Sequence, residues 1–257
     1  MSYDGFDLRG KVAVVVGGTS GIGRVIGKGL AEAGADLVPT GRRKDLVDGA
    51  ATEIESVGRR SLRITCDVSD RSSLQKVLEA VVKEFGKVDI LVYAAGITQR
   101  KPFLEVSEEE WHDVIETNLT GAFRTCQIFG SHMVTRGYGR IVSIGSLGSY
   151  LGLNGVAAYA ASKAGLAALT RTLAVEWASS GVCVNAIVPG VFPTALNQQL
   201  LNTPRGQEFL IRTPMKRFGK LEELVGGAIF LASDAASFVT GTLLHIDGGF
   251  LASGVNQ

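Results

Sequence analysis

The chain contains few cysteines, and they are far apart. The 257 residues include only Cys66, Cys126 and Cys183, so there is no CxxC pair and no cysteine–histidine cluster with metal-ligand spacing. This pattern excludes a structural zinc site, and we expect no metal. A sparse, odd number of thiols is typical of the reducing cytosol. We therefore expect buried free thiols and a cytoplasmic protein.

The chain has neither an excess of one charge nor a long hydrophobic run. Lysine and arginine number 26 against 25 aspartate and glutamate residues, which leaves a net charge of +1. A nucleic-acid-binding protein would show a basic excess or a basic stripe, so we expect no nucleic-acid partner. No run approaches the roughly 18 apolar residues that suggest a membrane-spanning helix, so we expect no membrane partner.

Glycine is abundant, with 33 residues, and short apolar runs alternate with longer amphipathic stretches. Strands that are apolar on both faces and are separated by helices predict a parallel sheet that is covered on both faces. Right-handed crossovers then give a single-domain, doubly wound, Rossmann-type α/β fold over residues 1–257. The seven predicted strands are residues 11–16, 36–40, 61–65, 88–93, 140–144, 182–187 and 243–246. The predicted helices are residues 22–33, 44–57, 69–85, 107–134, 157–179 and 221–231.

One segment, residues 191–220, interrupts this regular alternation. It contains Pro193, Pro204 and Pro214 and has weak periodicity. A long excursion in an otherwise regular α/β chain is often a loop that closes over an active site. We predict that residues 191–220 form a substrate loop or lid.

A glycine-rich turn lies between the first predicted strand and the first predicted helix, with the spacing G-x-x-x-G-x-G. Glycines let the backbone turn sharply and approach a pyrophosphate, whose charge faces the helix N-terminus. Because a strand precedes the turn and a helix follows it, we predict a dinucleotide-binding site rather than a purely structural turn. The expected cofactor contacts are Gly17, Thr19, Ser20, Gly21, Ile22 and Gly23.

The end of the second predicted strand indicates which dinucleotide is bound. An acidic side chain there would hold the ribose 2′-hydroxyl of NAD. Here the strand ends in Thr40-Gly41-Arg42-Arg43, so no carboxylate repels a 2′-phosphate and Arg42 can pair with it. We predict NADP(H) in preference to NAD(H); the alternative is that the two arginines only begin a solvated helix. Asp67 and Val68, after the third predicted strand, are expected to border the adenine.

A tyrosine and a lysine four residues apart are the first candidates for catalysis. On a helix, Tyr159 and Lys163 share one face. A phenol with a pKa of about 10 is a poor base at neutral pH, but a fixed cation nearby stabilises the phenolate. The tyrosine can then exchange a proton with an alcohol or a carbonyl.

Three further sites occur where this fold places ligands. Ser146 follows the fifth predicted strand, and its hydroxyl could steady a substrate oxygen. Asn118 falls inside a long predicted helix, where asparagine has poor propensity, so its amide is expected to hold a backbone group or a water. Pro189-Gly190 and Thr194 follow the sixth predicted strand, at the carboxyl edge of the sheet where ligands bind.

These motifs, in this order and on these elements, resemble the short-chain dehydrogenase/reductase family over nearly the whole chain. The resemblance implies that Tyr159 is the acid/base and that Ser146 orients the carbonyl or hydroxyl. It implies that Lys163 lowers the pKa of Tyr159 and holds the nicotinamide ribose. It also implies that Asn118 supports a water chain to Lys163 and that Thr194 contacts the carboxamide. Hydride would pass between the nicotinamide and a secondary alcohol or ketone carbon.

The resemblance also carries expectations about assembly and about one more cofactor contact. Members of the family use no metal and are commonly tetramers. Their interfaces are usually formed by two long helices, here residues 107–134 and 157–179, and by the C-terminal strand. The segment after the fourth predicted strand is expected to touch the cofactor through Ala94, Ala95 and Gly96.

Two positions depart from the family pattern. The threonine usual before the glycine turn is Val16 here, and the usual Asn-Asn-Ala-Gly is Tyr93-Ala94-Ala95-Gly96. The lost side chains normally brace the sheet and the turn. We therefore expect either lower local rigidity or a different brace from Tyr93, while every reacting group is retained.

Among relatives, the chain is most similar to sugar-acid and polyol dehydrogenases of the gluconate 5-dehydrogenase type, through residues 96–100, 116–121 and 247–252. A sugar acid needs a cation for its carboxylate and polar groups for its hydroxyls. The candidate cations are Arg100, Lys101, Arg205 and Arg212, each of which could instead be a solvated surface charge. The candidate hydrogen-bonding residues are Gln99, Ser149, Tyr150 and Asn154.

Two other functions stay open. A 3-oxoacyl-acyl-carrier-protein reductase shares the fold and every catalytic residue, but it would need a basic surface at the pocket mouth to receive an acidic carrier. A non-catalytic cofactor-binding or scaffold protein is disfavoured by the intact set of Ser146, Tyr159 and Lys163. The expected substrate is a small alcohol or ketone, and the expected assembly is a homotetramer.

Overall fold

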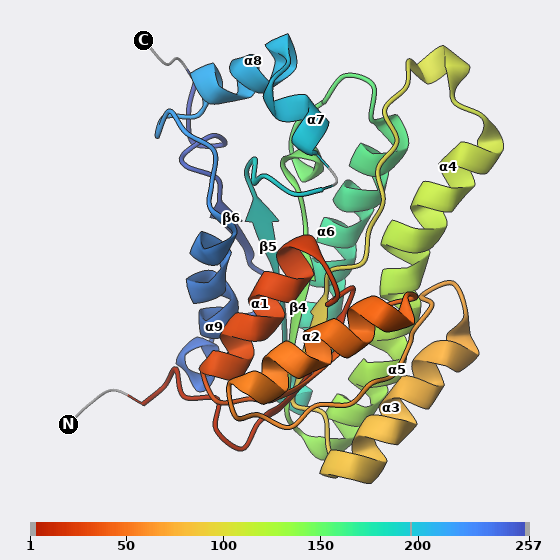
Figure 1. Ribbon diagram of the computed structural model, residues 1–257, viewed down its shortest axis with the longest axis vertical. Helices are drawn as coiled ribbons and strands as arrows, with labels where there is room; N and C mark the ends of the chain where they lie inside the picture. The colour runs from red at the N-terminus through yellow and green to blue at the C-terminus, as the bar shows by residue number, and fades with distance from the viewer. Residues whose placement is uncertain (1–3, 196, 255–257) are drawn as a thin grey trace.

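The protein is built around one parallel sheet. The computed structural model describes residues 4–195 and 197–254, and within them six strands lie in the order β2-β1-β3-β4-β5-β6 (Figure 1). β1 pairs with β2 on one side and with β3 on the other. The strand order therefore reverses at β1, and the carboxyl ends of β1 and β3 flank the switch point where such sheets bind ligands. The strands are β1 (Val12–Val16), β2 (Asp36–Thr40), β3 (Ile90–Tyr93), β4 (Gly139–Ile144), β5 (Val182–Pro189) and β6 (Leu243–Ile246).

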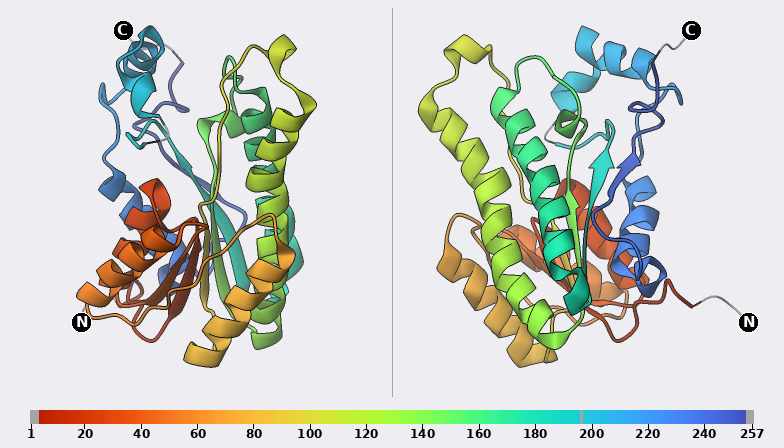
Figure 2. Two further views of the ribbon diagram at one scale, coloured as in Figure 1. Left: turned by 45° about the vertical axis from the view of Figure 1, so that its right-hand side comes forward. Right: turned by 180° about the vertical axis from the view of Figure 1, so that it is seen from behind.

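Helices cover both faces of the sheet, as Figure 2 shows. One face carries α1 (Gly21–Glu32), α2 (Lys44–Ser56) and α9 (Val225–Ala232). The other face carries α3 (Arg71–Phe85), α4 (Glu108–Ile115), α5 (Gly121–Arg136) and α6 (Ala157–Trp177). The short helices α7 (Gln198–Leu201) and α8 (Pro204–Arg212) lie beyond the carboxyl ends of the strands (Figure 1).

Two apolar cores lie on the two faces, and alternate residues of each strand enter different cores. In β1, Val14 packs with side chains of α3, α5 and α6, whereas Val15 packs with side chains of α1 and α9. This alternation follows from the period of two along a strand, and it explains why β1 is apolar at every position. The doubly wound α/β fold is thus confirmed. The three cysteines are buried free thiols, also as expected.

The prediction of seven strands was wrong: no strand forms at residues 61–65. This segment runs beside β2 but bonds to its backbone only near the two ends, where Arg60 accepts from Leu37 and Cys66 donates to Gly41. Between them, the donor on that side of β2 would be residue 39. It is Pro39, which has no N–H, so a regular ladder cannot form and β2 remains the edge of the sheet.

The helix predicted at residues 107–134 is interrupted. Its start is confirmed, because the Ser107 hydroxyl accepts from the Glu110 backbone and the Glu110 carboxylate accepts from the Ser107 backbone, as in a capping box. The chain then forms a π-helical turn (Glu116–Thr120) before α5 begins. Such turns are frequent at functional sites, and this one contains Asn118.

Within the described residues, no helix is long and apolar enough to cross a membrane.

Candidate active site

A cleft of about 530 Å³ opens at the carboxyl ends of β1, β3, β4 and β5. It lies at the switch point of the sheet, where the fold is expected to bind a ligand. Fifteen of the residues proposed from the sequence line it: Gly17, Thr19, Ser20, Gly21, Ile22, Gly23, Ala94, Ala95, Gly96, Ser146, Tyr159, Lys163, Pro189, Gly190 and Thr194. The structure therefore brings together segments that span most of the chain.

The glycine turn is shaped by two positions that admit no side chain. Gly17 has φ +84°, and a Cβ atom there would lie 2.5 Å from the backbone nitrogen of Ala95. A Cβ atom on Gly23 would overlap the carbonyl oxygen of Gly17. These close approaches hold the turn after β1 against the turn after β3 and leave the floor of the cleft free of side chains.

The N-terminus of α1 faces this cleft with its positive end uncompensated. Ser20, at the N-cap, forms no side-chain cap bond, and the first turn contains no acidic residue. The orphan amide groups and the helix dipole favour an anion at this end. Together with the side-chain-free floor, they fit the pyrophosphate of a dinucleotide, as the glycine pattern predicts.

The residues expected to choose between NADP and NAD lie beside this turn but do not line the cleft. Gly41 packs against Thr19, because a Cβ atom at Gly41 would lie 2.8 Å from the Thr19 hydroxyl oxygen. Arg42 is therefore carried to the edge of the glycine turn, where its side chain is exposed. Hydrogen bonds from Ser69 lower the pKa of the Asp67 carboxyl, and the positive charge of Arg42 adds to this effect. Val68 is mostly buried.

The catalytic candidates come from two elements that meet at the cleft. Tyr159 and Lys163 lie on the first turns of α6, and Ser146 follows β4 and begins a 3₁₀ turn (Leu147–Ser149). The Lys163 ammonium lies 5.7 Å from the centre of the Tyr159 ring. It donates a 2.7 Å hydrogen bond to the Ile144 carbonyl oxygen, which fixes the lysine at the end of β4.

Burial shifts both ionisable groups toward their neutral forms. It lowers the pKa of Lys163 to about 8, which leaves the ammonium mostly protonated at pH 7. It also raises the pKa of the Tyr159 phenol, and a hydrogen bond with Ser146 opposes part of that rise. Burial therefore outweighs the hydrogen bond at the phenol. The lowering that the family resemblance assigns to Lys163 stays a prediction.

Asn118 holds a backbone segment, as its place in a helix suggested. Its side-chain nitrogen donates to the Ile97 carbonyl oxygen (2.9 Å), and its side-chain oxygen accepts from the Ile97 amide (2.8 Å). The same nitrogen donates to the Ser162 hydroxyl at 3.1 Å. Asn118 thus ties the loop after β3 to α6. It does not line the cleft, although its oxygen and the Lys163 nitrogen both lie close to Gly96.

Tyr93 supplies the different brace that its departure from the family pattern called for. Its ring is fully buried, and its hydroxyl donates to the Thr117 carbonyl oxygen in the π-helical turn. Space for this hydroxyl exists because residue 121 is glycine: a Cβ atom there would lie 2.7 Å from the Tyr93 oxygen. Tyr93 therefore connects the end of β3 to the segment that carries Asn118.

Five residues that line the cleft had not been proposed from the sequence, namely Ile144, Gly145, Phe192, Ala195 and Asn197. Asn197 organises the segment after β5, because its side chain accepts from the Thr194 amide and donates to the Phe192 carbonyl oxygen. Nothing in the sequence singled out this asparagine, since the segment has only weak periodicity. Its place shortly after Pro189-Gly190, at the carboxyl edge of the sheet, was the one feature that could have suggested a role in the cleft.

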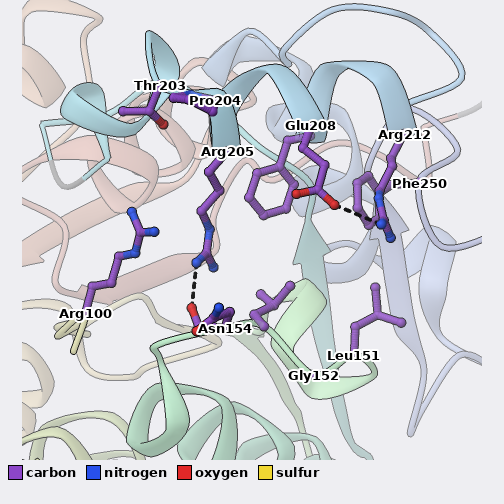
Figure 3. A pocket seen from close by; sticks show the side chains of 12 residues that line it. Arg100, Leu151, Gly152, Asn154, Thr203, Pro204, Arg205, Glu208, Arg212 and Phe250 are labelled. Carbon is purple, nitrogen blue, oxygen red and sulfur yellow. Dashed lines mark hydrogen bonds and ion pairs between the residues drawn. The ribbon is translucent and has the colours of Figure 1, made fainter. Parts of the chain in front are cut away.

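A second chamber of about 470 Å³ adjoins the cleft, and both are lined by Ser146 and Tyr159. Arg100, from the loop after β3, and Arg205, from α8, line this chamber and also a larger outer pocket of about 650 Å³. Figure 3 shows the two arginines entering the outer pocket from different segments. The guanidinium of Arg205 donates to the Asn154 carbonyl oxygen at 2.5 Å.

The other cation and hydrogen-bond candidates have partners elsewhere. Lys101 pairs with Glu110 at 3.1 Å, and Arg212 pairs with Glu208 at 2.8 Å at the wall of the outer pocket. The Ser149 hydroxyl donates to the Lys163 carbonyl oxygen. The Tyr150 ring packs edge-on against His245, and Gln99 interacts with Glu110. Among the cations proposed from the sequence, Arg100 and Arg205 thus line the chamber that contains Tyr159.

Known proteins resemble this chain over nearly its whole length. The family described as enoyl-(acyl carrier protein) reductase matches residues 16–251. A 2-dehydro-3-deoxy-D-gluconate 5-dehydrogenase from Dickeya dadantii is 41% identical over 256 residues, which are 98% of this chain and 100% of the relative. The chain belongs to the short-chain dehydrogenase/reductase family. It is accordingly an oxidoreductase of the class that acts on secondary alcohols.

Two further relatives of this short-chain dehydrogenase/reductase differ in substrate. The 3-oxoacyl-acyl-carrier-protein reductase of Escherichia coli is 39% identical over 243 residues, covering 95% of this chain and 98% of the relative. A gluconate 5-dehydrogenase from Burkholderia cenocepacia, solved with NADP and tartrate, has a TM-score of 0.94 at 36% identity. That alignment covers 98% of this chain and 99% of the solved chain.

Proposed function

We propose that this enzyme transfers hydride between NADP(H) and the secondary alcohol or ketone carbon of a sugar acid, in the manner of a gluconate 5-dehydrogenase. The single observation that carries the proposal is the joining of two spaces at Ser146 and Tyr159. A cleft suited to a dinucleotide lies on one side of these residues, and a chamber bordered by arginines lies on the other.

In the oxidation direction, the substrate hydroxyl is held between the Ser146 and Tyr159 oxygens. Tyr159, as the phenolate, takes the hydroxyl proton while the C–H electron pair leaves as hydride and the ketone forms. The chemistry that bound NADP(H) supplies is acceptance or donation of that hydride at the nicotinamide ring. In the reduction direction, Tyr159 returns the proton to the carbonyl oxygen.

Lys163 and Asn118 act on this proton step without touching the substrate. Lys163, held by the Ile144 carbonyl oxygen, places a positive charge next to the phenol and favours the phenolate. Its position also suits a contact with the nicotinamide ribose. Asn118 fixes the loop of Ile97 and thereby the wall of the cleft that faces Lys163.

Preference for NADP(H) rests on Arg42. It is exposed beside the glycine turn, and no carboxylate precedes it at the end of β2. A guanidinium is suited to a 2′-phosphate. Asp67, whose carboxyl is affected by the charge of Arg42, would border the adenine. The NADP-bound relative from Burkholderia cenocepacia supports this assignment.

A 3-oxoacyl-acyl-carrier-protein reductase is the second candidate, favoured by the 39% identical relative from Escherichia coli. The two candidates share the cleft and the catalytic residues. They differ in what the two arginines would meet, which is the carboxylate of a sugar acid in one case and the acidic surface of a carrier in the other.

The lid, the assembly and the location are also proposals. Residues 191–220 would close over the chamber, because α8 carries Arg205 into its wall. A homotetramer is supported by exposed apolar side chains on the face of the sheet that carries α5 and α6, such as Val175 on α6 and Phe123 on α5. Light scattering after gel filtration tests the tetramer, and a monomer would contradict it. A cytoplasmic location stays a prediction.

The deciding experiment is a substrate screen that follows NADPH absorbance with the purified enzyme. The substrates are gluconate, 2-dehydro-3-deoxy-gluconate, 5-ketogluconate, simple polyols and acetoacetyl thioesters, each with NADP(H) and with NAD(H). We expect turnover of the sugar acids with NADP(H). Thioester reduction without sugar-acid turnover would establish the second candidate instead.

A further inference from the structure

Arg100 and Arg205 both line the place where the inner chamber adjoins the outer pocket, which we call the neck. Both spaces are lined by both arginines, and only the inner one contains Ser146 and Tyr159. A substrate that moves from the outer pocket to Tyr159 therefore passes a wall that contains both arginines. In Figure 3 the side chains extend into this space from the loop after β3 and from α8.

One carboxylate, that of Glu208, acts on this pair electrostatically without forming an ion pair with it. Glu208, the nearest carboxylate on α8, is occupied by Arg212. Among the residues that the structure describes, neither Arg100 nor Arg205 has a carboxylate within ion-pair distance. Burial lowers the pKa of Arg205 and the neighbouring positive charge of Arg100 lowers it further, while the charge of Glu208 opposes part of this shift. Arg205 is partly buried and Arg100 is exposed, and two like charges that act on each other favour an anion between them.

The chain holds the two arginines in place independently of any ligand. Lys101, next to Arg100, donates from its backbone to the Gly155 carbonyl oxygen at 2.8 Å. The Arg100 stem itself lies against Gly155, where a Cβ atom would meet it at 3.4 Å. Arg205 is anchored one residue away, on the Asn154 carbonyl oxygen. Both arginines are thus held against the same loop, at Asn154 and Gly155. Little motion is therefore needed to bring an anion between them.

We propose that Arg100 and Arg205 together bind the carboxylate of the substrate and so select acids over neutral polyols. This inference rests on the proposed sugar-acid function and names the residues that set its specificity. With the carboxylate held at the neck, the carbon chain extends into the inner chamber and presents a remote carbinol to Ser146 and Tyr159. The guanidinium fork suits a carboxylate because it can donate two parallel hydrogen bonds.

The test compares Arg100→Gln and Arg205→Gln with Lys101→Gln as the matched control. Lys101→Gln removes the same charge from the same loop, but its ammonium is paired with Glu110 and does not line the chamber. We expect each arginine variant to raise KM for gluconate by about 10- to 100-fold, the range for a lost hydrogen bond to a charged group. We expect kcat to change little, since the contact is equally present in the ground state and the transition state. The control should change KM by less than about twofold.

A second readout separates recognition from folding. We expect NADP(H) affinity and melting temperature to stay near wild type, and glucitol, the neutral analogue, to lose no more than the control loses. Arg100→Lys and Arg205→Lys retain the charge and should recover part of the affinity. If wild type turns over gluconate but neither glutamine variant raises its KM beyond the control, the two-arginine assignment is wrong while the sugar-acid function stands. If wild type turns over no acid, the proposed function itself fails, and this inference with it.

Discussion

The cleft at the glycine turn and the chamber beside it share Ser146 and Tyr159 but are built in different ways. The cleft is lined largely by the glycine turn and by the carboxyl ends of β1, β3, β4 and β5, and two of its glycines admit no side chain because backbone atoms lie too close. The chamber is bordered in addition by Arg100, on the loop after β3, and by Arg205, on α8. We expect the cleft to serve the reaction of any substrate. The side chains of the chamber can change with little effect on the sheet, so we expect the chamber to set which substrate is bound.

The largest effect is expected where the two spaces meet. Tyr159→Phe removes the proton-transferring oxygen and keeps the ring, so kcat should fall by roughly 10²- to 10⁴-fold. NADP(H) binding, followed by fluorescence titration, should stay within about threefold of wild type, because the glycine turn is untouched. Near-normal turnover in this variant would remove the acid/base assignment and with it the functional division between cleft and chamber.

The buried lysine gives a stability effect with a defined pH window. Burial lowers the pKa of Lys163 to about 8 from an ordinary value of 10.5, so between these values the unfolded chain binds more protons than the folded one. Stability should therefore rise with pH across this window, by about 3 kcal/mol relative to the Lys163→Met variant.

Urea unfolding of both proteins at pH 7, 8, 9 and 10 measures this difference. Below pH 8 the folded protein carries the full cost of the buried ammonium, and that cost is relieved as the lysine loses its proton. Parallel stability curves for the two proteins would show that Lys163 does not titrate in this range.

A substitution at the edge of the cleft should change cofactor choice alone. Arg42→Ala should weaken NADP(H) binding by about 10- to 100-fold, the range for a lost charge-assisted hydrogen bond, and leave NAD(H) binding within about twofold. Arg43→Ala, at the next exposed arginine, is the control and should affect the two cofactors similarly. Equal losses of NADP and NAD in Arg42→Ala would mean that Arg42 does not contact the 2′-phosphate.

The smallest expected effect compares two glycine-to-alanine substitutions. At Gly23, the new Cβ atom would overlap the Gly17 carbonyl oxygen, so Gly23→Ala should destabilise the protein by about 1–3 kcal/mol and weaken NADP(H) binding. At Gly49, within α2, the new Cβ atom meets nothing within 4 Å. Gly49→Ala should therefore stabilise the protein by up to about 1 kcal/mol. Equal unfolding midpoints for the two variants would contradict the crowding at the glycine turn.

The regions differ as much in how far they could be predicted. Most of the proposed cofactor residues do line the cleft, because a glycine turn between a strand and a helix is a local pattern with one geometric use in this fold. Of the cation candidates, Arg100, Lys101, Arg205 and Arg212 were indistinguishable in the sequence. The structure shows that Lys101 pairs with Glu110 and that Arg212 pairs with Glu208 one helical turn earlier on α8. It is the packing of α8 against the loop after β3 that brings Arg205 to the chamber of Arg100.

The two errors in predicted secondary structure also arise from contacts with other segments of the chain. The 61–65 segment has the composition of a strand, but its neighbour presents Pro39 where a backbone donor is required. The helix around Asn118 has helical periodicity on both sides, but the Tyr93 hydroxyl reaches the Thr117 carbonyl oxygen and a π-helical turn forms there. Each outcome depends on a group from another segment, which periodicity within one segment does not register.

By itself, the sequence determined the doubly wound fold, the position of the glycine turn between β1 and α1, and the phenol and ammonium that we propose as the reacting groups. These are set by periodicity, by backbone conformations open to glycine, and by side-chain chemistry, all of which act over a few neighbouring residues. Tertiary structure alone decided the number of strands, the brace from Tyr93, the direction of the Tyr159 and Lys163 pKa shifts, and the meeting of Arg100 with Arg205. Those features depend on burial and on the approach of distant segments, and both arise only when the chain is packed.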